Sequence, residues 1–215
     1  MVHFEHQTLS QRIADSLTTR LVEGDLKPGT RLTEASLVEE YGTSRAPIRE
    51  ALYILEKSGV VERQPRKGVF VKQYSKHEVR EIYDVAYRLT EIALKKSVDC
   101  RTPEEIKTLK KYVEEMEQAL ERQNRKRIYL LVEDLHETLF HLSKNSILID
   151  LYKTFSPKWT TYRLITLSHS NSLNRTVHEY RQVVAAIEEQ DYEKAVNAMA
   201  EKEERVLRIL DRIMD

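Results

Sequence analysis

Apolar residues recur every three or four positions through most of this 215-residue chain. That period places them on one face of an α-helix, with polar residues on the other faces. The pattern predicts a first helix over about 8–23 and two short helices within about 33–56. It then predicts six longer helices, over about 75–98, 103–123, 125–143, 146–169, 174–189 and 191–214. Short connections and the lack of an alternating strand pattern among these six indicate an antiparallel all-α bundle.

Polar residues mark where two of the long helices begin. Ser75 with Glu78, and Thr102 with Glu105, have the spacing of a capping box. In that motif the side chain and backbone at the helix N-terminus hydrogen-bond to each other reciprocally. Pro103 stands at the first helical position, where its missing N–H removes no helical hydrogen bond. These signals fix the N-terminal ends of the helices predicted at 75 and 103.

The two short helices between 33 and 56 are separated by a glycine. Thr33 and Ser44 are residue types that cap helix N-termini, and Gly42 ends the first helix because glycine tolerates a positive φ. One face of the second helix is apolar and is expected to be buried; its residues are Ile48, Ala51, Leu52 and Leu55. The pattern therefore predicts a helix-turn-helix over about 33–56.

Arg45 and Arg49 lie four residues apart, so they share a face of the second helix that is not the apolar one. A helix that is anchored by one face and points two arginines outward has the geometry of a recognition helix in a DNA major groove. Residues 59–63 and 69–71 then read as two strands joined by a basic turn at 64–68. This order of helix, turn, helix and basic hairpin indicates a winged DNA-binding domain, with its wing at about 59–71.

The stretch from Gly24 to Val71 resembles the winged helix-turn-helix of the GntR family of bacterial transcription regulators. The matching residues are Gly24, Leu26, Pro28, Gly29, Arg31, Leu32, Ser44, Arg45, Pro47, Ile48, Arg49, Glu50, Ala51, Leu52, Leu55, Gly59, Gly68, Phe70 and Val71. The resemblance implies a homodimer that binds a near-palindromic double-stranded DNA operator. It also implies a transcriptional regulator, most often a repressor, whose operator affinity is modulated by a small-molecule effector.

The resemblance implies roles for individual side chains. Arg45 and Arg49 would reach base edges, guanine above all, through bidentate contacts. Ser44 and the backbone amides at the start of the same helix would hold phosphates, and Arg31 would contact another phosphate. The wing tip would approach the DNA in the minor groove, where a glycine permits close contact. Its residues are Arg66, Lys67 and Gly68.

Composition changes this picture only locally. The chain has 35 Lys and Arg and 35 Asp and Glu, so its formal net charge is zero. From Gly42 to Tyr74, however, seven basic residues stand against three acidic ones, a patch that attracts phosphates. A single cysteine, Cys100, excludes an internal disulfide. No apolar leader or membrane-spanning run is seen, so we expect a soluble cytoplasmic protein without a membrane partner.

The helical remainder resembles the effector domain of the FadR-type branch of the family, known as FCD. The matching residues are His136, Leu139, Phe140, Ser143, Asn145, Ala186, Ile187, Asp191, Ala195, Ala198 and Met199. The two resemblances together imply a winged DNA-binding domain over 1–74. They imply an all-helical effector-binding and dimerisation domain over 75–215.

Many members of that branch hold a divalent metal through one Asp and three His, and this pattern fails here. The Asp position is Val132, and the three His positions are His136, Tyr180 and Lys202. One ligand of four does not make a metal site, and a protonated lysine does not bind a metal. We therefore predict no metal cofactor for this chain.

The effector pocket expected from the resemblance departs from the family in a second way. Many relatives have an arginine that contacts an anionic ligand at the place of Ala86, and Arg88 is turned about 200° from that face. A carboxylate held by a metal and this arginine is therefore not predicted. The expected pocket is lined by Tyr83, Tyr87, His136, Tyr180 and Lys202. Its lysine could receive an anion; alternatively the core is closed, the lysine pairs with a glutamate, and Tyr180 caps a helix end.

Two other classes of function compete with a ligand-controlled regulator. An enzyme is not predicted, because the chain shows no nucleophile–base spacing, no glycine-rich phosphate loop and no complete metal set. A helical interaction protein that binds DNA non-specifically would show steep salt dependence without sequence preference. A regulator with no small-molecule ligand stays open as a further alternative.

Overall fold

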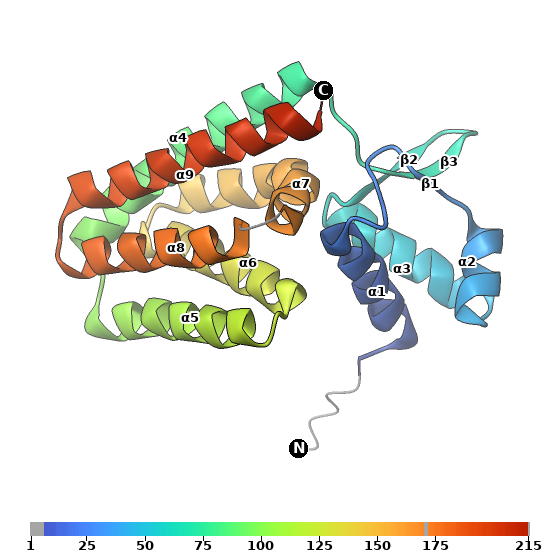
Figure 1. Ribbon diagram of the computed structural model, residues 1–215, viewed down its shortest axis with the longest axis horizontal. Helices are drawn as coiled ribbons and strands as arrows, with labels where there is room; N and C mark the ends of the chain where they lie inside the picture. Colours follow the sequence, from blue (N-terminus) through green and yellow to red (C-terminus); the bar gives the residue numbers. More distant parts are fainter. Residues whose placement is uncertain (1–6, 170–171, 215) are drawn as a thin grey trace. The chain divides into compact units, whose positions relative to one another are not determined.

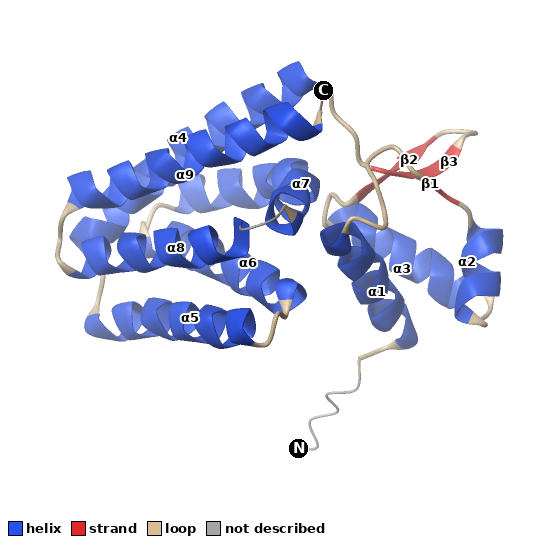
Figure 2. Cartoon of the chain, viewed as in Figure 1, coloured by secondary structure: helices blue, strands red, loops and turns tan. Residues whose placement is uncertain are grey.

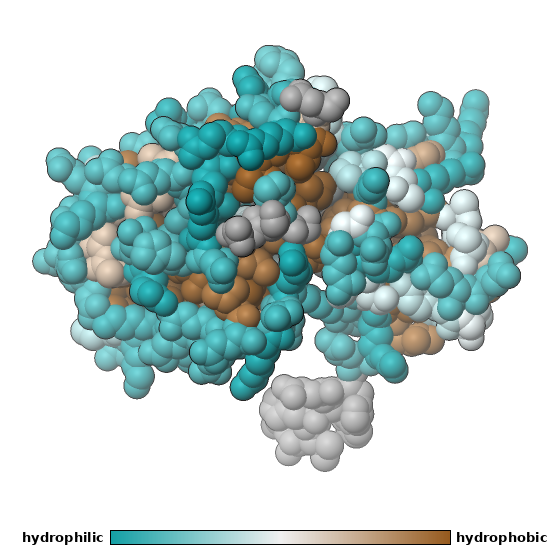
Figure 3. Space-filling model, in the orientation of Figure 1, coloured by the Kyte–Doolittle hydropathy of each residue, from teal (hydrophilic) through white to brown (hydrophobic). Residues whose placement is uncertain are grey.

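The computed structural model of the chain describes residues 7–169 and 172–214. It divides into two compact units, Met1–Gln73 and Tyr74–Asp215. The first unit combines helices with a small sheet, and the second is built from helices (Figures 1 and 2). Apolar side chains pack inside each unit, while hydrophilic residues cover most of the face shown in Figure 3. Each unit thus has its own hydrophobic core.

Three helices form the core of the first unit: α1 (Leu9–Glu23), α2 (Glu34–Tyr41) and α3 (Arg45–Lys57). The side-chain oxygen of Thr33 accepts a hydrogen bond from the Ser36 backbone N at 3.2 Å, so Thr33 caps α2 as predicted. Gly42 ends that helix with φ of 58°, in the left-handed region that glycine adopts without strain. Ser44 occupies the N-cap position of α3, but its side chain makes no capping hydrogen bond.

The first unit also contains a three-stranded antiparallel sheet in the order β1-β3-β2. Strands β2 (Val61–Gln64) and β3 (Gly68–Val71) form the predicted hairpin. The third strand, β1 (Arg31–Leu32), was not predicted, because two residues are too few to show an alternating pattern. It pairs with β3 so that Arg31 lies opposite Phe70. This pairing ties the chain segment before the helix-turn-helix to the base of the wing.

Six helices form the second unit, and each lies within a few residues of its predicted range. They are α4 (Lys76–Cys100), α5 (Pro103–Glu121), α6 (Arg125–Leu142), α7 (Ser146–Ser168), α8 (Ser172–Glu188) and α9 (Tyr192–Ile213). Helix α4 lies beside α9, α9 beside α8, and α8 beside α5 (Figure 1). Both predicted capping boxes are present, at Ser75 and at Thr102. Apolar residues from all six helices contribute to one large core.

Helix α7, like α8 and α9, carries polar side chains into the bundle. Its buried polar residues are Thr160, Thr161, Arg163 and Thr166. Tyr162, on the same helix, accepts a hydrogen bond from the Tyr74 backbone N at 2.7 Å and donates one to the Tyr74 carbonyl at 2.9 Å. A helix with buried polar residues is costly for stability unless those groups find partners. The buried polar residues of α7, α8 and α9 therefore indicate where in the bundle to look for a site.

The capping box of α5 provides a test of local stability. Replacing Thr102 with Ala removes the acceptor for the Glu105 backbone N and should lower the free energy of unfolding by about 0.5–2 kcal/mol. Urea unfolding followed by circular dichroism measures this change. Thr108→Ala in the same helix is the matched control. Its exposed hydroxyl only bonds back to the Glu104 carbonyl, so stability should stay within about 0.5 kcal/mol. Equal effects of the two variants would contradict the capping role.

Candidate nucleic-acid interface and buried cavity

Helix α3 is held in the first unit by its apolar face. Ile48, Ala51 and Leu52 are fully buried there, while Arg45 on another face is exposed to solvent. The side-chain hydroxyl of Ser44 has no capping bond within the helix, so it is available to an outside acceptor or donor. The structure therefore presents the N-terminal end of α3, with its unpaired backbone N–H groups, toward solvent.

The sequence suggested that Arg49 projects freely from this face, but in the structure it has a partner. Its Nε donates hydrogen bonds to both carboxylate oxygens of Glu34, at 3.0 and 2.9 Å. This exposed ion pair is worth about 0–1 kcal/mol, so DNA can displace it at low cost. Alternatively the pair persists and fixes the direction of the guanidinium. Sequence reasoning missed this pairing, because Glu34 in the first turn of α2 is fifteen residues before Arg49.

The wing tip is a tight turn that exposes two basic side chains. The Lys67 backbone N bonds to the Gln64 carbonyl at 3.1 Å, and both Arg66 and Lys67 are exposed. Gly68 has φ of 117°, and a Cβ at this position would lie 3.3 Å from Nε of Arg31. A side chain here would therefore crowd Arg31. The structure brings Arg31 to the wing, although the sequence separates them by more than thirty residues.

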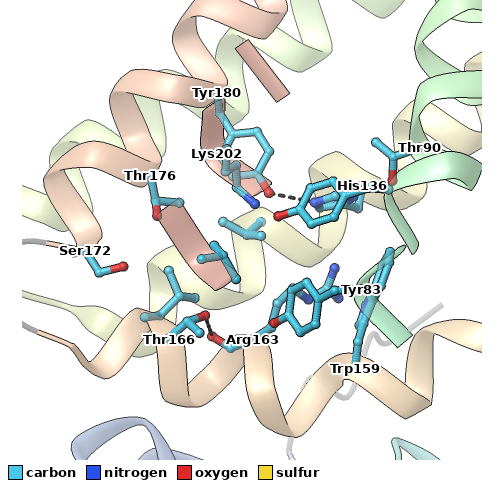
Figure 4. Close-up of a pocket in the computed structure, with 14 residues that line it drawn as sticks. Tyr83, Thr90, His136, Trp159, Arg163, Thr166, Ser172, Thr176, Tyr180 and Lys202 are labelled. Carbon is cyan, nitrogen blue, oxygen red and sulfur yellow. Dashed lines mark hydrogen bonds between the residues drawn. The ribbon is translucent and has the colours of Figure 1, made fainter. Parts of the chain in front are cut away.

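The second unit contains a buried cavity between its helices (Figure 4). All five residues expected at the effector pocket line it: Tyr83, Tyr87, His136, Tyr180 and Lys202. Nine further residues complete the lining: Thr90, Val132, Trp159, Arg163, Thr166, Leu167, Ser172, Thr176 and Val206. The cavity volume is about 30 Å³, enough for one or two water molecules. A larger occupant therefore fits only if the helices move apart.

His136 and Tyr180 form a hydrogen-bonded pair across the cavity. Nε2 of His136 lies 2.6 Å from the Tyr180 hydroxyl, and both side chains are buried. Burial lowers the pKa of His136 well below its usual value, and the charges of Arg163 and Lys202 lower it further. Burial likewise raises the pKa of Tyr180 above its usual value. Both groups are thus neutral at physiological pH. In their hydrogen bond, one of them donates and the other accepts.

Lys202 is buried among aromatic rings and has no carboxylate partner in the part of the chain that the structure describes. Its Nζ lies 5.1 Å from the ring centre of Tyr180 and 5.8 Å from that of Tyr87. Burial lowers the pKa of Lys202 to about 7, although the charge of Glu179 opposes the shift. An amine with this pKa is only partly protonated at neutral pH. It gains a full charge when an anion approaches.

The alternative of a closed core held by a lysine–glutamate pair is not what the structure shows. Glu179, the carboxylate on α8, instead receives two hydrogen bonds of 2.6 Å from Arg205. Arg205 also donates to Ser172 and Thr176, which satisfies the guanidinium from one side. The hydroxyl of Tyr180 bonds to His136 and does not cap a helix. Arg205 competes successfully for Glu179 because its planar fork matches a carboxylate.

Arg163 on α7 is a charged cavity residue that sequence reasoning missed. It is buried, pairs with Glu133 of α6, and lies 4.8 Å from the ring centre of Trp159. Burial alone would lower the pKa of Arg163, but the Glu133 carboxylate raises it above the usual value, so the guanidinium is charged. An arginine within an amphipathic helix reads as a surface residue, and only its packing against Trp159 shows otherwise. No simple spacing rule in the sequence would have found it.

The residues at the family's metal position do not fit a metal. Val132 supplies an apolar side chain, and Nε2 of His136 is already engaged with Tyr180. Lys202 stands at the third His position and brings an amine that is partly protonated at neutral pH. Across 7–169 and 172–214, no three His, Cys, Asp or Glu side chains are grouped so that they could hold a metal ion. Arg88 is exposed and pairs with Asp84 and Glu91, away from the cavity.

In comparisons with known proteins, a different family model matches each of the two units of the chain. Residues 9–71 match the model of the bacterial regulatory proteins of the gntR family, and residues 81–203 match the FCD domain. The Escherichia coli regulator McbR is 26% identical over 208 residues, which cover 96% of this chain and 94% of that protein. The Bacillus subtilis gluconate operon transcriptional repressor is 27% identical over 156 residues, 73% of this chain and 64% of that one.

Solved structures show the same fold. The structure of Escherichia coli McbR/YncC matches with a TM-score of 0.73 and 24% identity, over 98% of this chain and 100% of that one. A GntR-type regulator from Rhodococcus sp. matches with a TM-score of 0.66 and 16% identity, over 94% and 96%. Among the helices of the described residues, none is long and apolar enough to cross a membrane.

The buried amine of Lys202 predicts a pH-dependent stability. Because the pKa is about 7 in the folded chain and near 10.5 ordinarily, the unfolded chain binds more protons between these values. The free energy of unfolding should therefore rise with pH over this window. Lys202→Met should flatten that rise and raise stability at pH 7 by about 1–4 kcal/mol. Urea unfolding at pH 7, 8 and 9 measures both effects.

The exposed Lys107 gives the control for this prediction. Lys107→Met makes the same substitution at an exposed position. It should leave the pH dependence of unfolding as in the wild type. A Lys202→Met chain that is less stable at pH 7, with an unchanged slope, would show that the ammonium is well solvated in the folded state.

Proposed function

We propose how this chain, which belongs to the GntR family of bacterial regulatory proteins and carries a C-terminal FCD domain, acts as a transcriptional regulator. The family is one of DNA-binding regulators and not of enzymes. In our proposal the chain binds a near-palindromic operator as a homodimer through its winged units. A small molecule in the cavity of the helical unit changes operator affinity. Repression is the proposed outcome, and the similarity to the gluconate operon transcriptional repressor of Bacillus subtilis supports it.

The observation that carries the DNA-binding proposal is the arrangement of basic groups on the first unit. Arg45 and Arg49 project from α3, whose opposite face is buried, and Arg66 and Lys67 project from the wing. In winged proteins a helix in the major groove and a basic element beside it contact one stretch of duplex together. We assign base contacts to the α3 arginines. We assign phosphate or minor-groove contacts to Ser44, Arg31 and the wing tip.

Homodimerisation is proposed on two grounds. A single winged unit reads few base pairs, so two half-sites are needed for a specific operator. The helical unit also exposes apolar side chains at helical spacing on two helices. Val85 and Ile92 of α4 are 43% and 47% exposed, and Ile147 and Leu151 of α7 are 68% and 49% exposed. Light scattering of the purified chain should give twice the subunit mass of 25.3 kDa.

An effector in the cavity can act only through its different affinity for two arrangements of the protein. The cavity supports this role because its walls combine aromatic rings with Lys202, Arg163 and His136. Its small volume sets a limit: an effector larger than a few atoms must widen the helical unit when it binds. That widening is the kind of change that a second site can sense. The same small volume favours the second candidate, a regulator without a ligand.

Two matched substitutions test the DNA-binding roles. Arg45→Ala should weaken binding to the specific operator by about 1–3 kcal/mol and relax the sequence preference at one position of each half-site. Lys67→Ala should weaken binding to all sequences alike and reduce the slope of log affinity against log salt by about one. The operator is found by footprinting the region upstream of the chain's own gene, and affinities follow from fluorescence anisotropy at several salt concentrations.

Lys107→Ala, a change on the helical unit, is the control and should bind operator like the wild type. Two results would contradict the proposal. One is no protected site on any upstream fragment together with a steep salt dependence, which fits a non-specific binder. The other is an equal loss for Arg45→Ala on operator and random DNA, which would remove that arginine from the base contacts.

A further inference from the structure

One of the two arginines assigned to base contacts is held by an acidic side chain. Nε of Arg49 donates to both carboxylate oxygens of Glu34, at 3.0 and 2.9 Å. Glu34 begins α2 and Arg49 lies in the second turn of α3, so the pair joins two helices that pack against each other (Figure 1). Within the residues that the structure describes, no other side chain assigned to a DNA contact is paired with a carboxylate. The pair therefore sets Arg49 apart from Arg45.

Glu34 is the better anchored member of this pair. Its side chain is 29% exposed, whereas that of Arg49 is 61% exposed. Glu34 occupies the first turn of α2, where the helix dipole and the unpaired backbone N–H groups favour a carboxylate. That turn is itself fixed by the capping hydrogen bond to Thr33. The longer and more exposed side chain of Arg49 is thus oriented by Glu34, and not the reverse.

The pair determines which edge of the guanidinium is free. An arginine has five N–H donors, one on Nε and two on each terminal nitrogen. Glu34 occupies Nε, and within the described residues Nη1 and Nη2 of Arg49 make no hydrogen bond. Two such terminal nitrogens match the O6 and N7 acceptors of guanine. Arg49 therefore presents one donor edge in one direction, which a freely rotating arginine does not.

Glu34 also places a negative charge on the surface that is proposed to meet a polyanion. An arginine without a carboxylate partner attracts any phosphate, whatever the base sequence. The Glu34 carboxylate lowers that attraction and repels the DNA backbone itself. A base edge is less affected, because its acceptors carry only partial charges and the terminal nitrogens of Arg49 stay free. We therefore expect a lower affinity for random DNA and a higher ratio of specific to random affinity.

We propose that Glu34 is a positioning residue that sets the sequence preference of Arg49. It holds the guanidinium at Nε, directs the two terminal nitrogens to a guanine, and weakens the attraction to phosphates. The ion pair persists in the complex and is not displaced by DNA. The inference rests on the proposed operator binding by α3. It adds α2 to the elements that determine specificity, although Glu34 itself makes no base contact.

Two substitutions separate the charge of Glu34 from its hydrogen bonds. Glu34→Gln keeps an oxygen that accepts from Nε of Arg49 and removes the charge, whereas Glu34→Ala removes both. Glu34→Gln should bind random DNA about threefold more tightly than the wild type, because a negative charge beside the phosphates is lost. Glu34→Ala should show the same gain and also about a tenfold loss of discrimination at the base pair that Arg49 reads.

Fluorescence anisotropy of the full chain measures both effects. The duplexes are the footprinted operator, the operator substituted at one base pair at a time, and random DNA of the same length. The base pair that Arg49 reads is the one at which Arg49→Ala loses its preference. Each ratio compares affinities within one preparation, so a fraction of unfolded chain does not change it.

Glu40 provides the matched control. It lies on the same helix, α2, and pairs with Arg20 of α1 at 2.8 Å. Glu40→Gln makes the same substitution in an exposed ion pair that contains no arginine assigned to DNA. Any change in affinity that it causes should be equal for operator and random DNA, and the base preference should stay that of the wild type.

A double-variant cycle tests whether Glu34 acts through Arg49. In the Arg49→Ala background, Glu34→Ala should cause no further loss of base discrimination, because the guanidinium that it positions is gone. The proposal is wrong if the two losses add, if Glu34→Ala keeps the wild-type preference, or if Arg49→Ala keeps it at every position. It is also wrong if Glu40→Gln lowers the ratio of specific to random affinity as much as Glu34→Gln does.

The wild type alone tests the regulator itself. If it showed no operator preference, the proposed function would fail and this inference with it. If it prefers an operator and the Glu34 variants share that preference unchanged, the inference alone fails.

Discussion

The helical unit buries positively charged side chains. The free-energy cost of removing these charges from water is the constraint on which the rest of the unit depends. Three cationic residues, Arg163, Lys202 and Arg205, are buried in one bundle, and each meets this cost differently. Arg205 donates hydrogen bonds to a carboxylate and two hydroxyls. Arg163 has a carboxylate partner but leaves N–H groups unpaired. Lys202 packs against aromatic rings, and burial lowers its pKa instead. The three cationic residues thus differ in how completely they are hydrogen-bonded. The two that are less completely bonded, Arg163 and Lys202, line the cavity.

The fold was largely readable from the sequence because its signals are local. The capping boxes at Ser75 and Thr102 and the 3.6-residue apolar period each involve residues within one or two turns, and both capping boxes are present. The apolar face of α3 was predicted for the same reason. Strand β1 was not, because its existence depends on pairing with β3 far along the chain. Two residues without a partner carry no strand signal of their own.

The cavity was predictable only where a family pattern marked its residues. His136, Tyr180 and Lys202 came from aligned metal positions, and Tyr83 and Tyr87 from the helix that faces them; all five line the cavity. Arg163 and Trp159 were not predicted, since their meaning depends on how α7 rotates in the bundle. The pairing of Glu34 with Arg49 was missed for the same reason. Contacts between helices determine all three, and helical periodicity does not encode them.

The unpaired polar groups beside the cavity also bear on how so small a site could control a regulator. Moving an equilibrium from 1:99 to 99:1 requires about 5.5 kcal/mol of differential affinity. Hydrogen bonds to a charged group contribute about 1.5–3 kcal/mol each. Two or three such bonds, made in only one arrangement of the helices, are therefore sufficient. Around the cavity, Trp159 and Arg163 have buried N–H groups without hydrogen-bond partners, and Glu133 and His136 have buried acceptor-capable atoms without them. A bundle that is imperfectly satisfied when empty is one whose packing an occupant can change, whereas a fully satisfied core has nothing to gain from it.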